Sequence, residues 1–146
     1  MIIDFDGMEE KPVDGFKGGV GITNLRKFEN ELGKIIMGRL EPGATIGLHT
    51  HETNSEVIYI ISGTADFLYD PEDPAVSGNS DQNPDAASNG SSANATSSSN
   101  CDLLYDKNRY ETVKAGGCHY CPKGHSHSMI NNGNEDIVFF AVVPEQ

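Results

Sequence analysis

Short apolar runs, separated by turn-forming residues, dominate the chain and predict a fold made of strands. The runs occupy residues 34–40, 45–51, 56–61, 65–69, 110–113, 118–121, 127–130 and 137–143. Seven or eight short strands at such close spacing, with Gly and Pro between them, are typical of a sandwich or barrel. The pair Asn132-Gly133 between the last two runs predicts a hairpin. We therefore expect an all-β protein.

One strand offers a test of this pattern, because alternation fixes which side chains share a face. If the carboxylate of Glu56 points into the protein, Ile58 and Ile60 point inward with it. Val57 and Tyr59 then face outward. Strong helix patterns are nearly absent. Residues 24–32 are the one stretch that allows a short helix, and its apolar positions are Leu25, Phe28 and Leu32.

Residues 71–104 interrupt the strand pattern with a polar insertion. They contain five acidic residues and no Lys or Arg, and residues 77–100 consist mainly of Ser, Asn, Ala, Asp and Gly. A stretch of this composition buries too little apolar surface to offset the entropy of ordering. We expect a long disordered loop inserted in one domain that spans residues 1–146.

Composition narrows the class of protein. A length of 146 residues favours a single domain, and a hydrophobic fraction of 36% plus 16 glycines permits a compact core. The formal net charge of −12 argues against binding to nucleic acid or to anionic membranes. The start of the chain is acidic rather than basic, which favours a cytoplasmic protein over a secreted one. Three cysteines, an odd number, do not indicate a disulfide framework.

Three side chains in the middle of the chain form a candidate metal site. His49 and His51 lie two residues apart on a predicted strand, so alternation places both on one face, and Glu56 follows closely. Two imidazoles and a carboxylate suit several divalent transition metals. A His-x-His pair alone is also common as an accident of the surface, so the pair does not decide the matter.

Two spaced motifs make the pattern more specific. The first has the order Gly43, five residues, His49-Thr50-His51, four residues, Glu56, six residues and Gly63. The second has the order Gly116, five residues, Pro122-Lys123-Gly124, two residues, His127, three residues and Asn131. Both agree at every defining position with the two motifs of the cupin superfamily. The chain therefore resembles a small single-domain bacterial cupin over residues 34–143, apart from the insertion.

The resemblance implies a fold and a metal site. The fold would be a double-stranded β-helix, which is the cupin form of the jelly-roll barrel. The metal ligands would be His49, His51, Glu56 and His127, holding one divalent transition metal such as Zn, Mn, Fe or Ni. Three imidazoles and one carboxylate would leave one or two positions of an octahedral ion open, as a reacting substrate or water requires. A closed structural site is more often tetrahedral and often contains cysteine.

Other polar residues near the motifs are weaker candidates. Arg39 and Tyr120 are considered for orienting an anionic substrate, and His125 or His119 for acid or base chemistry at the barrel mouth, although ordinary packing or exposure is the favoured explanation for each. His119 is expected at the surface or rim. Cys118 and Cys121 form a CxxC sequence on a predicted strand, where positions i and i+3 face opposite sides, so we expect two packed thiols with no disulfide between them.

The resemblance implies a small-molecule function without specifying it. Dioxygenases, sugar or sugar-phosphate isomerases and epimerases, lyases and decarboxylases all occur among cupins, and a fold does not determine function. The leading hypothesis is a metal-dependent enzyme acting on a small molecule. The alternative is a non-catalytic protein that binds or senses a small molecule through its metal. The resemblance also suggests a homodimer, since small cupins commonly pair through sheet edges or exchanged N-terminal strands, and residues 1–17 contain apolar side chains with no obvious partner in the barrel motifs.

Overall fold

The structure is a computed structural model that describes residues 1–69 and 110–145. These residues form ten strands and one short 3-10 helix, η1 (Phe16–Gly18). The strands are β1 (Lys11–Asp14), β2 (Ile22–Asn30), β3 (Gly33–Leu40), β4 (Thr45–Thr50), β5 (Glu56–Ser62), β6 (Thr64–Tyr69), β7 (Tyr110–Lys114), β8 (Cys118–Cys121), β9 (Ser126–Ile130) and β10 (Ile137–Pro144). The insertion predicted to be disordered, residues 71–104, lies outside the described residues.

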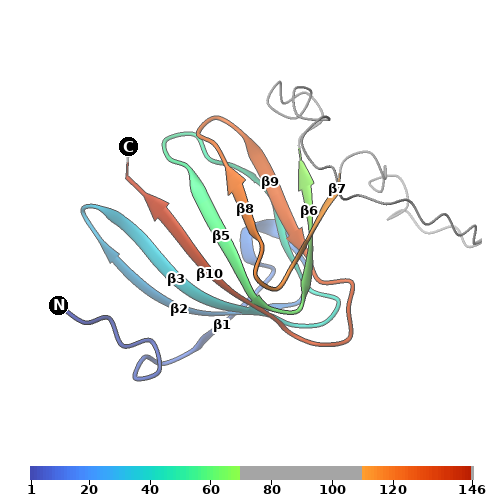
Figure 1. The fold of residues 1–146 in the computed structure, drawn as a ribbon, viewed down its shortest axis with the longest axis horizontal. Coiled ribbons are helices and arrows are strands. Elements are labelled where there is room, and N and C mark those ends of the chain that lie inside the picture. The colour runs from blue at the N-terminus through green and yellow to red at the C-terminus, as the bar shows by residue number, and fades with distance from the viewer. Residues whose placement is uncertain (70–109, 146) are drawn as a thin grey trace, which may run out of the picture.

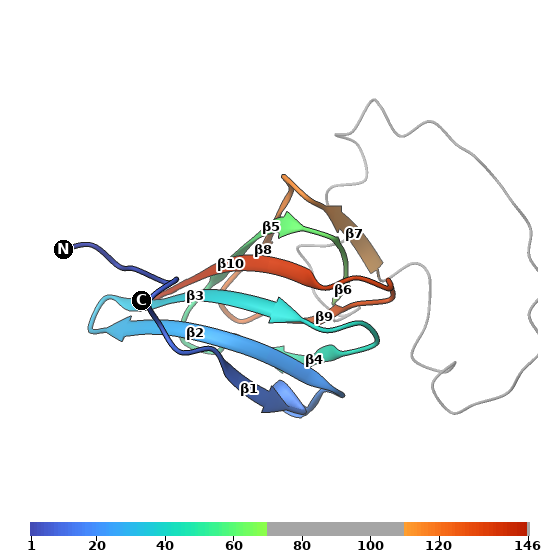
Figure 2. The same ribbon diagram turned by 90° about the horizontal axis from the view of Figure 1, so that it is seen from below.

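The strands build two antiparallel sheets that together make the double-stranded β-helix expected from the sequence. The larger sheet has the order β1-β2-β3-β10-β5-β8, and the smaller has the order β4-β9-β6-β7. Figures 1 and 2 show the larger sheet curving round so that the smaller one faces it. In the described part of the chain, no helix has the length and apolar character needed to cross a membrane.

The core lies between the two sheets and follows the predicted alternation. On β5 the side chains of Ile58 and Ile60 are buried, whereas Val57 and Tyr59 are exposed. Phe67 of the smaller sheet is fully buried in the same core. Glu56 therefore points inward on the same face of β5 as Ile58 and Ile60, which form the apolar floor of the barrel, as the sequence predicted.

All eight predicted runs are strands, but the short helix expected over residues 24–32 is wrong. The segment instead forms most of β2, which pairs with β3 from Thr23↔Leu40 to Asn30↔Gly33 and with β1 on its other side. Backbone hydrogen bonds to two neighbouring strands are available to an extended segment only. With three apolar positions, an isolated helix here has too narrow an apolar face to compete.

The hairpin predicted at Asn132-Gly133 is also wrong, because β9 and β10 belong to different sheets. The turn carries the chain from one layer to the other. The buried side chain of Asn131 stabilises this corner, donating from Nδ2 to the carbonyl oxygens of Leu40 at 2.9 Å and Glu135 at 2.8 Å. A turn sequence specifies a reversal of the chain, and tertiary packing decides whether the flanking strands pair.

Part of the N-terminal segment has a partner that the sequence did not reveal. Strand β1 pairs with β2 of the same chain, from Lys11↔Leu25 to Asp14↔Ile22. Phe16 packs against the core. The segment therefore does not lack a partner in its own barrel, and the homodimer stays a prediction.

Candidate metal centre

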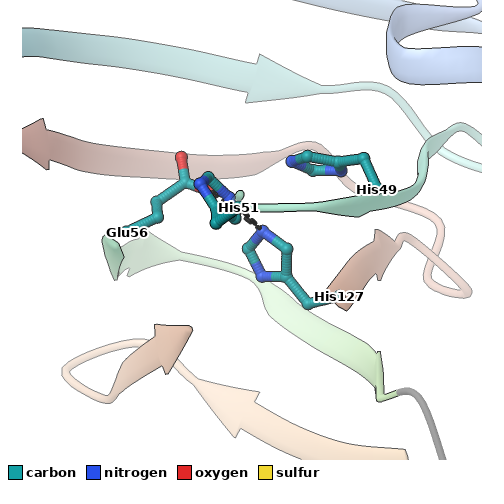
Figure 3. Close-up of side chains that lie close together, drawn as sticks. All are labelled: His49, His51, Glu56 and His127. Atoms are coloured by element: carbon teal, nitrogen blue, oxygen red, sulfur yellow. Dashed lines mark hydrogen bonds and ion pairs between the residues drawn. The ribbon is translucent and has the colours of Figure 1, made fainter. Parts of the chain in front are cut away.

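Four side chains from three strands and one loop converge inside the barrel (Figure 3). His49 lies on β4, His51 directly follows that strand, Glu56 begins β5, and His127 lies on β9. One ligand atom from each lies within 4.8 Å of the others. This is the set of four that the sequence motifs predicted, and the structure brings all of them together.

The pairing of β4 with β9 accounts for much of this convergence. His49 is the cross-strand partner of His127, and Thr50 is the partner of Ser126. The register shifts between Ile46 and His49, so this part of β4 follows an irregularity in the ladder. Irregular strand geometry often re-aims side chains near functional sites. Here it accompanies three imidazoles whose ring centroids are 4.8–5.0 Å apart.

Outer hydrogen bonds orient the rings of His49 and His51. The Nδ1 of His49 lies 2.8 Å from the carbonyl oxygen of Gly47, and the Nδ1 of His51 lies 2.9 Å from Oδ1 of Asn54. Both partners are acceptors, so each Nδ1 carries the proton and each Nε2 keeps its lone pair. The lone pair of an imidazole Nε2 is a metal-ligating group.

His127 is oriented in the same way by another histidine. Its Nδ1 lies 3.0 Å from Nε2 of His119, which can accept a hydrogen bond from the Nδ1–H group. The His119 ring is 2% exposed and stacks on Phe67 with centroids 4.0 Å apart, while its Nδ1 lies 4.0 Å from the Glu111 carboxylate. The expectation that His119 lies at the surface or rim is therefore wrong. Its strand partner is the inward-facing Ile58, so the register of β8 on β5 turns His119 inward.

Sequence reasoning missed His119 and Asn54 as parts of the site. The spacing between His119 and Cys121 held a signal, because residues two apart share a face of a strand and Cys121 is buried. Without the register of β8, that signal did not show which face was internal. Asn54 lies in the loop between β4 and β5, where no periodicity constrains a side chain.

The inward atoms form a tight polar cluster. Oε2 of Glu56 lies 3.1 Å from Nε2 of His51 and 2.9 Å from Nε2 of His127, and these two nitrogens are 3.1 Å apart. Burial alone would raise the pKa of Glu56, but the hydrogen bonds to His127 and His51 outweigh it and lower that pKa to about 2. The hydrogen bond to Glu56 raises the pKa of His51. Burial lowers the pKa of His49 to about 4.

A cavity of about 910 Å³ opens next to this cluster. All four residues of the cluster line it, together with apolar side chains of the core that include Ile46, Ile58 and Phe139. Charged side chains line it as well, and these are Glu9, Lys11, Lys17, Lys27, Lys34 and Glu52. Its size lies near the upper end of the range for small-molecule sites. A small molecule in this cavity can therefore lie against the cluster.

The chemistry of the donor set fits a divalent transition metal. Neutral imidazole nitrogens and a carboxylate are ligands for such ions, and here they are held with their lone pairs inward. His51 Nε2, His127 Nε2 and Glu56 Oε2 lie within 3.1 Å of one another, so one cation placed among them can accept a lone pair from each deprotonated group. In the described residues, the group is able to hold a metal ion, whose identity the donor set does not determine.

Comparison with known proteins agrees with this geometry. The Cupin family model matches residues 18–146, which is most of the chain. The protein belongs to the cupin family. The match begins within η1, ahead of the region that the two sequence motifs cover, and therefore includes β2.

Relatives of this cupin include proteins named for oxalate. An oxalate-binding protein of Thermotoga maritima is 26% identical over 149 residues, which cover 98% of this chain and 93% of the relative. Among solved structures, a predicted oxalate decarboxylase from the same organism has a TM-score of 0.70 at 20% identity, with both chains fully covered. A sugar phosphate isomerase of the cupin superfamily from Silicibacter pomeroyi has a TM-score of 0.63 at 15% identity, covering all of this chain and 76% of that one. Such structural likenesses show the fold.

The three candidate catalytic residues of this cupin, which are Arg39, Tyr120 and His125, do not line the cavity. The guanidinium of Arg39 lies 2.6 Å from Glu10 and 2.8 Å from Asp136. Tyr120 is 58% exposed on β8. His125 precedes β9, and its carbonyl oxygen accepts a hydrogen bond from the His51 backbone at 2.9 Å. None of the three lines the cavity.

The two described cysteines face opposite sides of β8, as the strand pattern predicted, but the expectation that both thiols are packed is wrong for Cys118. Cys118 is exposed, Cys121 is buried, and both are free. Burial raises the pKa of the Cys121 thiol to about 12, which disfavours the reactive thiolate. The CxxC sequence of this cupin is therefore not arranged for disulfide chemistry.

Proposed function

We propose that this cupin holds one divalent transition metal on His49, His51, Glu56 and His127 and acts on a small organic anion. The observation that carries the proposal is the orientation of the imidazoles. Each Nδ1 faces an outer acceptor, on Gly47, Asn54 or His119, and leaves its Nε2 for the cluster. Ligands oriented in this way bind metal more tightly than freely rotating ones.

An enzyme is favoured over a passive binding protein by the ionisable groups around the cavity. Lysines and glutamates line it beside an apolar floor, whereas a sensor for an apolar ligand would have no need of them. When bound, the metal supplies a Lewis acid that polarises an oxygen of the ligand. The protein's own part is to hold the ligand set rigid, to screen it with buried Ile58 and Met129, and to admit the ligand through the cavity.

A small carboxylic acid is the favoured class of ligand. The similarity to an oxalate-binding protein and to a predicted oxalate decarboxylase supports this class. The lysines at the cavity support it independently, because a carboxylate is attracted to an ammonium group. The reaction, whether oxygenase, isomerase or lyase, is left to experiment. A non-catalytic metal-dependent binding protein is the alternative, and it would show ligand binding without turnover.

The test begins with the metal. The full chain is purified without a nickel column or a histidine tag, and its metal content is measured by elemental analysis. The protein is then reloaded with Mn, Fe, Ni or Zn and screened for binding and turnover of small acids and sugar phosphates. We expect about one equivalent of metal, and turnover or binding that depends on it.

The matched variants are His51→Ala and His125→Ala. The first removes a proposed ligand and should abolish most metal binding. The second removes a histidine that does not line the cavity and should retain the metal. Full metal content in His51→Ala would refute the proposed site.

A further inference from the structure

Cationic side chains are concentrated at the cavity. The chain has 10 Lys and Arg residues and a net charge of −12, yet Lys11, Lys17, Lys27 and Lys34 all line this one space. Two of the four have partners, because Lys27 lies 2.6 Å and Lys34 lies 3.4 Å from the carboxylate of Glu29. Of the pairs between described residues, none engages the ammonium group of Lys11 or Lys17.

Lys17 differs from the other three in its backbone. Its φ angle is 57°, and it is the one non-glycine residue with a positive φ among residues 1–69 and 110–145. A lysine pays a steric cost in this region that glycine avoids, and residues held in this way cluster at functional sites. The neighbouring positions Gly15 and Gly18 also have positive φ, so a glycine at position 17 would fit the turn better.

Two glycines, Gly19 and Gly47, allow the turn that contains Lys17 to pack directly against β4, the strand that contains His49. A Cβ on Gly47 would lie 2.3 Å from the carbonyl oxygen of Lys17, and a Cβ on Gly19 would lie 2.0 Å from the carbonyl oxygen of Thr45. The backbones therefore touch, and no side chain can separate them. The same Gly47 accepts the hydrogen bond from Nδ1 of His49. Lys17 is thus anchored beside Gly47, which lies two residues from a proposed ligand.

Lys17 and the four residues of the ligand cluster line the same cavity. The carboxylates of Glu9 and Glu52 also line the cavity, so its charge is mixed rather than uniformly positive.

We propose that Lys17 binds a second acid group of the ligand, while the first acid group lies at the metal. The class of ligand is a small organic acid with two anionic groups, too far apart for both to bind the metal. A cavity of about 910 Å³ has room for a spacer between the two groups. This role explains the cost of holding a lysine at φ 57°, because a glycine would adopt this backbone conformation but has no charged side chain to bind the anion. This subsite rests on the proposed function, since it needs a metal to hold the first group.

The test compares monocarboxylates with dicarboxylates on the metal-loaded full chain. Calorimetry measures the affinity of the Mn²⁺-loaded protein for acetate and for oxalate, malonate, succinate and glutarate. We expect at least one of the longer dicarboxylates to bind at least about tenfold more tightly than acetate, as a charged hydrogen bond provides. In Lys17→Gly this gain should vanish while acetate binding changes less than about twofold.

Control variants separate the effect of the Lys17 charge on ligand binding from any effect of the substitution on folding. Lys17→Gly should keep its metal content and should not lower Tm, because glycine adopts this φ without steric cost. Lys17→Asn, which also tolerates a left-handed backbone, gives a second neutral variant, and Lys17→Arg should retain most of the gain. Lys114→Gln makes the same change in net charge on β7, away from the cavity, and should behave as the wild type.

The outcomes distinguish the two proposals. If the wild-type protein binds metal but shows no preference for any dicarboxylate, the subsite is refuted and the metal site stands. The subsite is likewise refuted if Lys17→Gly and Lys17→Asn keep the wild-type preference. If the wild-type protein takes up no metal, the proposed function fails and the subsite fails with it.

Discussion

The Nε2 of His119 lies 3.0 Å from the Nδ1 of His127, so one buried histidine holds another in place. His127 presents its Nε2 to the cluster, and this nitrogen is a good ligand only while the proton resides on Nδ1. The Nε2 of His119 accepts a hydrogen bond from the Nδ1–H of His127 and thereby favours this tautomer. The stacking of His119 on Phe67 fixes the accepting ring in turn. The arrangement makes His119 a positioning residue for the proposed metal.

Replacing His119 tests this relationship. His119→Ala should weaken metal binding by about 10- to 100-fold, the usual effect of losing an outer partner of a ligand. His119→Gln, whose amide oxygen can accept a hydrogen bond from Nδ1–H of His127, should restore part of the affinity. Metal affinity is measured by competition with a chromogenic chelator, and the Tm of the metal-free variants shows how much of the change is loss of packing. An unchanged metal affinity in His119→Ala would contradict the role.

Metal release on acidification should be steep. Protons compete with the metal for three imidazoles, whose unperturbed pKa is about 6.5, and for one carboxylate of about 4.3. Bound metal stabilises the deprotonated ligands, so release should occur over roughly pH 4–6. The holo-protein is titrated while free metal is followed with a chelator. A release curve that follows one proton, or release complete at pH 7, would indicate an adventitious ion instead.

The metal-free protein should lose stability as the pH falls from about 6.5 to 4. Burial lowers the pKa of His49 to about 4 and that of His119 to about 3, below the value of about 6.5 expected in the unfolded chain. In this pH range the unfolded state binds more protons, so acid favours unfolding. The raised pKa of His51 opposes the trend, whereas the pKa of Glu56, lowered to about 2, adds to it at the acid end of the range. Urea unfolding at several pH values checks the sign, and greater stability at pH 5 than at pH 7 would contradict it.

Deleting residues 71–104 should leave a folded barrel. The segment is inserted between β6 and β7, which pair with each other, and Leu68 is the partner of Tyr110. The two ends of the insertion therefore begin from neighbouring strands, and a short connection can replace it at little entropic cost. The deletion variant should keep its metal content and a Tm within a few degrees of the full chain. A large loss of Tm would show that the insertion packs on the barrel.

Thiol counting should find three free groups in the denatured protein. Cys118 and Cys121 face opposite sides of β8, and Cys101 lies outside the described residues. In the native protein, the exposed Cys118 should react quickly and the buried Cys121 slowly, because burial raises the pKa of Cys121 to about 12. Finding a single free thiol would overturn this assignment.

The sequence by itself determined the fold class, the family resemblance and the four proposed ligands. Strands leave a local signature, because alternation and turn residues act over a few positions. The spacing of His49, His51 and Glu56 is also local, so the sequence predicted two of them on one strand and Glu56 at the start of the next, although His51 directly follows the strand in the structure. Only His127 is distant in sequence, and its own motif identified it.

Tertiary structure decided the features that depend on which strands become neighbours. Residues 24–32 form a strand because β1 and β3 satisfy their backbone hydrogen bonds on both sides. His119 is internal because β8 pairs with β5 in a register that places it opposite Ile58. Lys17 lines the cavity beside a point where Gly19 and Gly47 allow two backbones to touch. A register and a close approach both join residues far apart in the chain, and so no local pattern records them.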